Sequence, residues 1–441
     1  MRFSEHIGKG AWAFASRGLP LLYAIALIAV ARVIPKDEFG LLAVFQTFFT
    51  IIFSFSDSFA LQAIVKFSVE PDINLSHLLT VISALFLAFL FVCNTALLAV
   101  AGPVSQLLKV PQLSNLLTLL AVLSFVSAPR VISSKILQSN FRMRELFWVD
   151  FGYFGVASMI ILIMLLMHRI ASAADIVTVT IVSASFSSFL GVVFARRSIR
   201  WRIAWSSSML RQISSFVKYQ AATGVVSVAQ QNFDLLLVSA FTGAVGAATY
   251  QGAKILYRGY DIVRDTALLF IFPASSKYYS RGETGTLTKI VGKAVGLLYW
   301  LLVPISALLF VFCPYVFHAL WGTKFEDSIP LFRILTVASF ALPLQIILPM
   351  ALIGTGEVKR VFRILAISVL ISLLLSVVLL SIFGIAGAAI AFVLTMILQA
   401  VLYYRVSAKM FKISIRSAVL GSWHDTKNYL IDMLRNKAKN N

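Results

Sequence analysis

The chain has 441 residues, of which 59% are hydrophobic and 13% charged, with a formal net charge of +20 and a mean hydropathy of +0.90. This balance excludes a water-soluble globular fold, because soluble domains carry about 25% charged residues. At roughly 20 apolar residues per crossing, the length accommodates about a dozen membrane helices and leaves no room for a large soluble domain.

Apolar segments separated by short polar breaks are taken in chain order as candidate membrane helices. The first six are 10–33, 39–64, 77–102, 112–133, 147–168 and 173–195; after a basic connector follow 213–240, 246–275, 288–314, 328–354, 361–383 and 386–408. We therefore predict an all-α integral membrane protein with about twelve transmembrane helices in two six-helix bundles. The predicted lobes are 1–200 and 201–408, related by a parallel pseudo-two-fold repeat because six helices per half is an even number.

The tail, 409–441, is basic and has apolar residues at roughly helical spacing, which predicts an amphipathic helix on the cytoplasmic headgroups. The Lys and Arg residues in and beside the breaks fall into two sets, one for each side of the membrane. Alternate breaks and the tail hold 27 of them, and the opposite breaks hold 5. By the positive-inside rule, both termini are expected in the cytoplasm, and the net charge is mostly a topology signal rather than a sign of nucleic-acid binding.

The few cysteines and histidines and the absence of certain motifs argue against several kinds of chemistry. Cys93 and Cys313 lie in apolar runs, and the five histidines are scattered without metal-ligand spacing. No phosphate-binding loop or nucleophile elbow is present in the sequence. We expect no metal, no cofactor and no catalytic residues.

Four charged residues of the segment 246–275 fall on one helical face: Lys254, Arg258, Asp261 and Asp265. A charge at the bilayer centre costs about 2.5–3.5 kcal/mol on insertion scales, so this face is expected to contact protein or water rather than lipid. Two interpretations stay open. In one, the charges pair with each other and fix this helix to its bundle.

In the other interpretation, the same helix forms the cationic wall of a central cavity. Lys254 and Arg258 would bind a diphosphate, for which the arginine guanidinium is well suited. Tyr250 and Tyr257 would add hydrogen bonds and stacking surfaces for sugars.

Other segments contribute single charges. Arg17 and Asp57 are expected either to pair across the first hairpin or to line the cavity. Asp234 is a candidate proton or sodium site, or the partner of Lys254. Arg130, Arg264 and Arg333 lie near segment ends, where snorkelling to the interface is expected.

Three stretches of the sequence form recognisable motifs. The first runs from Asn232 and Asp234 through Gly243 and Gly246 to Tyr250, Ala253 and Lys254; the second is 137–145, LQSNFRMRE; the third is 384–391, GIAGAAIA. These stretches resemble polysaccharide-biosynthesis membrane proteins, the O-antigen and exopolysaccharide flippases of the multidrug/oligosaccharidyl-lipid/polysaccharide exporter superfamily. Their order and spacing carry the resemblance over nearly the whole chain.

The resemblance implies two six-helix lobes, a cationic central cavity and alternating access. It implies that a polyprenyl-diphosphate-linked oligosaccharide is carried across a bacterial cytoplasmic membrane, with membrane lipids and polysaccharide assembly proteins as further partners. Two alternatives stay open. One is an ion-coupled small-molecule or drug antiporter of the same superfamily, and the other is a membrane glycosyltransferase or polymerase, for which the external breaks are short.

Overall fold

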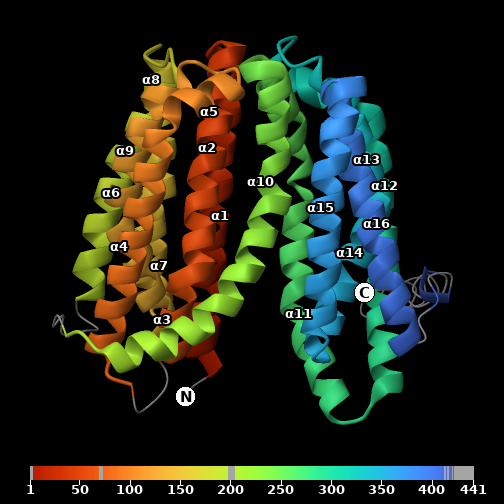
Figure 1. Ribbon diagram of the computed structural model, residues 1–441. Coiled ribbons are helices and arrows are strands. Elements are labelled where there is room, and N and C mark those ends of the chain that lie inside the picture. Colours follow the sequence, from red (N-terminus) through yellow and green to blue (C-terminus); the bar gives the residue numbers. More distant parts are fainter. Residues whose placement is uncertain are drawn as a thin grey trace, which may run out of the picture. The chain divides into compact units, whose positions relative to one another are not determined.

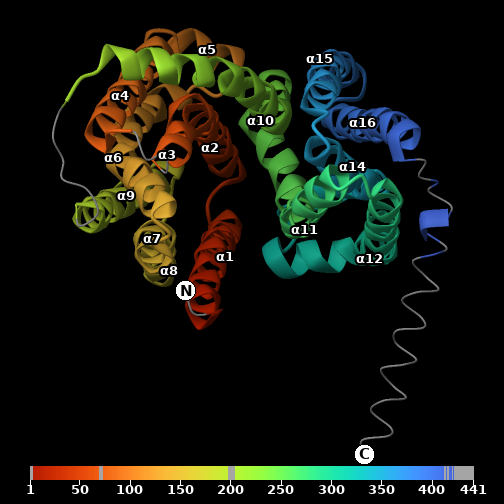
Figure 2. The same ribbon diagram turned by 90° about the horizontal axis from the view of Figure 1, so that it is seen from below.

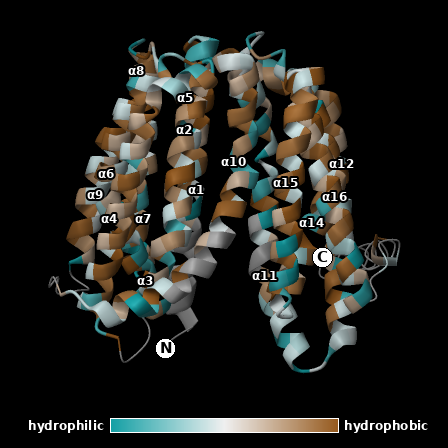
Figure 3. Cartoon of the chain, in the orientation of Figure 1, coloured by the Kyte–Doolittle hydropathy of each residue, from teal (hydrophilic) through white to brown (hydrophobic). Residues whose placement is uncertain are grey.

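The structure is a computed structural model that describes residues 3–68, 73–196, 204–411, 414, 417–419 and 421 (Figure 1). Within these residues every regular element is a helix. Ten helices are long and apolar enough to cross a membrane, or eleven if one bent pair counts as a span. Apolar residues cover the middle of these helices (Figure 3). The predicted all-α, multi-pass membrane fold is confirmed.

The described chain divides into two compact units. The first contains Met1–Thr249 with Leu320–Lys324, and the second contains Tyr250–Ala319 with Phe325–Asn441. The predicted lobe boundary at residue 200 follows the sixth predicted membrane helix, whereas these units are defined by contacts. The lobe boundary stays a prediction.

The first unit begins with helices that each overlap a predicted segment. They are α1 (Phe3–Val33), α2 (Lys36–Ser56) continuing through η1 (Asp57–Leu61) into α3 (Gln62–Phe67), α4 (Leu75–Ala99), α5 (Ala101–Leu107), α6 (Leu113–Ser139), α7 (Met143–Asp150) continuing through η2 (Phe151–Gly155) into α8 (Val156–Leu166), and α9 (Ala173–Ala195). Both η1 and η2 are π-helical turns. Such turns insert an extra residue into a helix and are frequent at functional sites.

The second unit contains helices α11 to α16. They are α11 (Tyr260–Ser280), α12 (Thr284–Trp321, whose last residues belong to the first unit), α13 (Ser328–Val337), η3 (Ala338–Phe340), α14 (Leu342–Gly354), α15 (Val358–Phe383) and α16 (Ile385–Phe411). The pair α13–η3 and α14 is bent by 45° and covers the predicted segment 328–354. The predicted amphipathic tail helix falls almost entirely outside the described residues.

Helix α10 (Ser207–Tyr257) bends at Gly243, whose dihedral angles (φ 72°, ψ −167°) are not helical. Glycine adopts this region without the strain that a Cβ would add. The loop after α5 supports the bend, because Lys109 Nζ donates to the Phe241 carbonyl (2.8 Å) and Ser239 Oγ donates to the Leu108 carbonyl (2.9 Å). The predicted break between 240 and 246 is thus confirmed, and the first arm of α10 packs within the first unit.

The predicted helix over 246–275 is present in two pieces, because the end of α10 and the start of α11 meet in a tight turn at Arg258 and Gly259. One membrane-spanning stretch, Gly224–Arg264, runs through this turn. The amide of Gly259 donates to the Leu256 carbonyl (3.1 Å) and that of Asp261 to the Arg258 carbonyl (2.9 Å). These bonds span three residues instead of four, which tightens the turn and shifts the angular position of everything after it. The single charged face predicted for this segment is therefore interrupted.

The segment Leu320–Lys324 lies in the first unit because it caps α1. Trp321 Nε1 donates to the Ile28 carbonyl (3.1 Å), and Lys324 Nζ donates to the carbonyls of Ala31 (2.9 Å) and Ile34. A cation at a helix C-terminus satisfies carbonyls that lack helical partners and interacts favourably with the helix dipole. Burial lowers the pKa of Lys324 from its ordinary value, the nearby Lys36 lowers it further, and Asp37 opposes the shift.

Gly40 places α2 against the backbone of α10, and we expect Gly40→Ala to destabilise the protein by about 2 kcal/mol, within the usual range for overpacking. A Cβ at this position would overlap the carbonyl group of Ala244, which cannot rotate away as a side chain would. Denaturant titration of the purified protein, followed by circular dichroism, measures the effect. Gly18→Ala is the control, because a Cβ there meets nothing within 4 Å. Equal stability of the two variants would contradict this close approach.

Candidate functional site

The predicted cationic pair at the end of α10 is split between two environments. Lys254 is 8% exposed, whereas Arg258 is exposed. The Lys254 ammonium lies 5.8 Å from the ring centroid of Tyr250, a distance at which a cation is attracted to an aromatic face. Arg258 follows in the turn before α11, where its amide donates to the Lys254 carbonyl (2.9 Å).

One acidic residue of the same stretch has a described partner. Asp261 pairs with Arg264 one turn further along α11 (2.8 Å), and both side chains are nearly half exposed. Arg264, for which snorkelling was expected, thus has an acidic neighbour. The side chain of Asp265 lies outside the described part of the structure.

The two predicted sugar-stacking tyrosines are buried. Tyr250 is 0% exposed and Tyr257 is 7% exposed. The Tyr257 ring packs edge-on against Tyr260 and Phe392, with centroids 5.2 Å away in each case. Tyr260 shares a hydrogen bond with Ser306 of α12 (2.6 Å). This aromatic cluster fixes the turn that carries Arg258 to neighbouring helices of the second unit.

In the first unit, Asp57 forms an ion pair with Lys135 of α6. The carboxylate of Asp57 lies 2.5 Å from Lys135 Nζ, and its other oxygen accepts a hydrogen bond from Gln62 (2.7 Å). The predicted pairing of Asp57 with Arg17 is wrong, because α6 extends to Ser139 and brings Lys135 beside the π-turn η1. Arg17 is exposed on α1.

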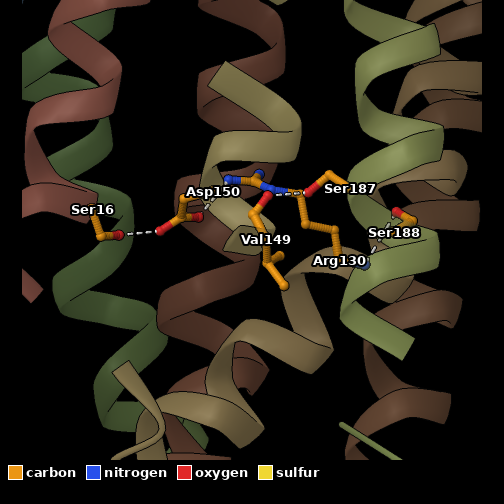
Figure 4. A network of polar contacts seen from close by, with 6 residues as sticks. All are labelled: Ser16, Arg130, Val149, Asp150, Ser187 and Ser188. Carbon is orange, nitrogen blue, oxygen red and sulfur yellow. Dashed lines mark hydrogen bonds and ion pairs between the residues drawn. The ribbon is translucent and has the colours of Figure 1, made fainter. Parts of the chain in front are cut away.

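A second intramembrane ion pair joins α6 to the end of α7 (Figure 4). Arg130 Nη2 lies 3.1 Å from Asp150 Oδ1, and the two side chains are 15% and 18% exposed. Ser16 of α1 donates to the other carboxylate oxygen (2.5 Å). The guanidinium also stacks over the ring of Tyr153, 4.0 Å from its centroid. The prediction that Arg130 snorkels to the interface is therefore wrong, because its ion pair with the largely buried Asp150 keeps the guanidinium inside the unit.

Two consecutive serines of α9 form hydrogen bonds to backbone groups of the two helices that carry this pair (Figure 4). Pro129 interrupts the hydrogen-bond ladder of α6. Ser188 bridges the gap, accepting from the Arg130 amide (3.3 Å) and donating to the Val126 carbonyl (2.6 Å). Ser187 donates to the Val149 carbonyl (2.6 Å) beside the π-turn η2. The backbone on both sides of the ion pair is thus fixed by α9.

Asp234 lies on the first arm of α10, half-buried, and its side chain accepts from the Leu235 amide (2.8 Å). Its predicted pairing with Lys254 stays a prediction. Arg333 donates to the Phe310 carbonyl (3.3 Å) and lies over the Phe310 ring.

Sequence reasoning missed two residues of these clusters. Asp150 lies inside the predicted segment 147–168, so the rule that selected the other intramembrane charges applies to it equally. Lys135 was assigned to a cytoplasmic break because the apolar run of the fourth segment ends before it. The hydropathy of the sequence does not show that α6 continues beyond residue 133 to Ser139.

The chemistry available in the described spans is that of binding. Lys254 and Arg258 offer cationic donors of the kind that bind phosphate oxygens, whereas Asp57 and Asp150 are already neutralised by Lys135 and Arg130. Within the described residues, no group of three His, Cys, Asp or Glu side chains is placed to hold a metal ion.

Comparisons with solved structures identify the fold. Over 91% of this chain and 98% of the other, it resembles an inward-facing multidrug resistance MATE family transporter of the MOP superfamily, with a TM-score of 0.78 and 13% identity. Over 96% of this chain and 93% of the other, it resembles the lipid II flippase MurJ in an inward closed conformation, with a TM-score of 0.74 and 13% identity. The chain therefore has the fold of MOP superfamily transporters.

Sequence comparisons identify the family. The chain is 20% identical over 211 residues to the probable low-salt glycan biosynthesis flippase Agl15 of Haloferax volcanii. That match covers 48% of this chain and 45% of Agl15, so it spans less than half of the curated relative. A family model described as polysaccharide biosynthesis protein matches residues 29–330. Since that match covers more than half of the chain, the chain belongs to the polysaccharide biosynthesis protein family.

Proposed function

We propose that the protein is a flippase that moves a polyprenyl-diphosphate-linked oligosaccharide, an O-antigen or exopolysaccharide repeat unit, across a bacterial cytoplasmic membrane by alternating access. The family match over residues 29–330 carries this proposal. The similarity to a probable glycan flippase and the fold shared with a lipid II flippase support it. In this proposal the protein forms and breaks no covalent bond, and both termini lie in the cytoplasm.

The physical need for such a protein is the cost of moving a charged headgroup through hydrocarbon. A diphosphate and its sugars cannot cross the bilayer core without substitute solvation. We propose that Lys254, Arg258 and Arg17 contact the diphosphate in the course of transport, since each is a cation within a membrane-spanning stretch. The polyprenyl tail need not be enclosed by protein.

Tyr250 and Tyr257 have a different role in this proposal from the one their sequence spacing suggests. Their burial favours a supporting function, in which they hold the Lys254–Arg258 turn in place rather than stack on sugars. Energy coupling, if an ion gradient drives transport, is assigned to the carboxylates Asp57, Asp234, Asp261 and Asp265.

The test is the sidedness of lipid-linked oligosaccharides in a deletion strain, measured by mass spectrometry with a membrane-impermeant reagent. Completed units are expected to accumulate on the cytoplasmic face, and the wild-type gene is expected to clear them. If amount and sidedness are unchanged by the deletion, the flippase proposal fails and an antiporter of the same superfamily takes its place.

A further inference from the structure

A groove of about 360 Å³ lies within the first unit between α4, α6 and α9, and its lining includes Pro129, next to Arg130 of the Arg130–Asp150 pair. These three helices lie side by side in both ribbon views (Figures 1 and 2). Its walls are apolar and include Leu87, Phe125 and Val192. These side chains are 43%, 40% and 40% exposed and belong to membrane-spanning helices, so the groove opens toward lipid.

The groove runs from one end of the helices toward mid-membrane. Arg196 lines one end, directly after the last residue of α9. At about 1.5 Å per residue, Phe125 lies roughly 20 Å along α6 from Ser139, and Leu87 a similar distance from the start of α4. By the predicted topology, the Arg196 end faces the cytoplasm. These dimensions suit an extended acyl chain of the cytoplasmic leaflet, whose hydrocarbon is about 15 Å deep.

Two serine hydroxyls at the groove lack the bond that helical serines usually make. Ser133 is 1% exposed and lines the groove, yet its Oγ has no hydrogen-bond partner in the described structure. The same holds for the buried hydroxyl oxygen of Ser83 on α4. A serine in a helix ordinarily donates to the carbonyl one turn earlier, so these two hydroxyls keep an unused hydrogen-bonding capacity beside the groove.

Arg196 places a cation at the groove end. In the sequence, Arg196 is followed by Arg197, Arg200 and Arg202, and no Asp or Glu occurs between Asp175 and Asp234. A basic cluster at the cytoplasmic end of membrane helices attracts anionic lipid headgroups. The apolar walls suit the acyl chain of a phospholipid, the hydroxyls its ester region and the cationic end its phosphate.

We propose that this groove binds one anionic phospholipid of the cytoplasmic leaflet. Its acyl chain lies against Leu87, Phe125 and Val192, its glycerol ester region meets Ser83 and Ser133, and its phosphate meets Arg196. This site is independent of the transported substrate, and its occupancy does not require the protein to be a flippase.

Photo-crosslinking tests the proposal on the full chain in phosphatidylcholine nanodiscs. The probe is phosphatidylglycerol with a diazirine in one acyl chain, and labelled peptides are identified by mass spectrometry. Label is expected to concentrate on the peptides that contain Leu87, Phe125 and Val192. Val192→Trp, which fills the groove, is expected to remove most of it. Leu162→Trp is the control, because Leu162 is also lipid-exposed (47%) but lies on α8.

The headgroup preference is tested separately. Arg196→Gln is expected to reduce labelling by phosphatidylglycerol about fivefold relative to a phosphatidylcholine probe. Arg211→Gln, which removes an exposed cation of α10, is expected to leave the ratio unchanged. Label spread evenly over lipid-facing helices, or an unchanged ratio in Arg196→Gln, would overturn the proposal. So would displacement of the phospholipid probe by a polyprenyl phosphate, which would assign the groove to a different lipid.

Discussion

Replacing Asp150 with alanine is expected to lower the free energy of unfolding by about 3 kcal/mol. The substitution leaves the Arg130 guanidinium without its carboxylate in a site where both side chains are largely buried, and an uncompensated buried charge typically costs about 3–5 kcal/mol. It also removes the acceptor of Ser16, which is one of the contacts between α1 and α7. Unfolding of the purified protein by sodium dodecyl sulfate, followed by circular dichroism, measures the change.

The double variant Arg130→Met with Asp150→Leu removes both charges and keeps bulky side chains, so it distinguishes the cost of an unpaired charge from the cost of lost packing. If the cost arises from the unpaired charge, the double variant unfolds closer to wild type than either single variant does. Ser16→Ala is expected to cost about 1 kcal/mol, the net value of one hydrogen bond. A double variant that is less stable than both single variants would show that the ion pair itself, and not the avoidance of a lone charge, stabilises the unit.

Lys254→Gln is expected to lower the transport rate by about tenfold to a hundredfold while leaving the protein folded. A charged hydrogen bond to a phosphate contributes about 1.5–3 kcal/mol, and glutamine keeps a polar side chain that is one atom shorter and carries no charge. Lys254→Arg retains the charge and is expected to retain most of the activity. The rate is measured with reconstituted protein and a lipid-linked oligosaccharide.

Lys277→Gln is the matched control for this prediction. Lys277 is an exposed lysine of the same unit near the end of α11, and its charge is not expected to meet the substrate. Equal losses in both variants would point to a general effect of net charge. No loss in Lys254→Gln would remove Lys254 from the proposed binding set.

The number and order of the membrane helices could be predicted from the sequence. Hydropathy is averaged over a whole segment, so a few atypical residues do not change the prediction. All twelve predicted segments overlap helices, and the break at Gly243 follows from the two glycines of the interval 241–246. The turn at Arg258 and Gly259 escaped prediction because the charged residues around it also fit one face of a continuous helix. Since helical phase accumulates at about 100° per residue, the three-residue bonds at this turn shift the angular position of the residues after it relative to Lys254.

The pairing of charges was less predictable than their presence. Asp57 meets Lys135 because the π-turn η1 redirects its side chain and α6 runs one turn past its apolar run. Likewise, Arg130 meets Asp150 only because two serines of α9 hold the interrupted helices on either side. Such contacts depend on which helices become neighbours, and hydropathy carries no information on that choice.

The measurement that tests the central claim most directly is transbilayer movement of a polyprenyl-diphosphate oligosaccharide in liposomes that contain the purified protein. A membrane-impermeant glycosidase reports how much of the oligosaccharide is on the outside, with and without a proton or sodium gradient. With active protein, nearly all of the oligosaccharide is expected to become accessible, whereas protein-free liposomes expose only the outer half. Accessibility equal to that of protein-free liposomes under every gradient would contradict the assignment of this chain as a flippase.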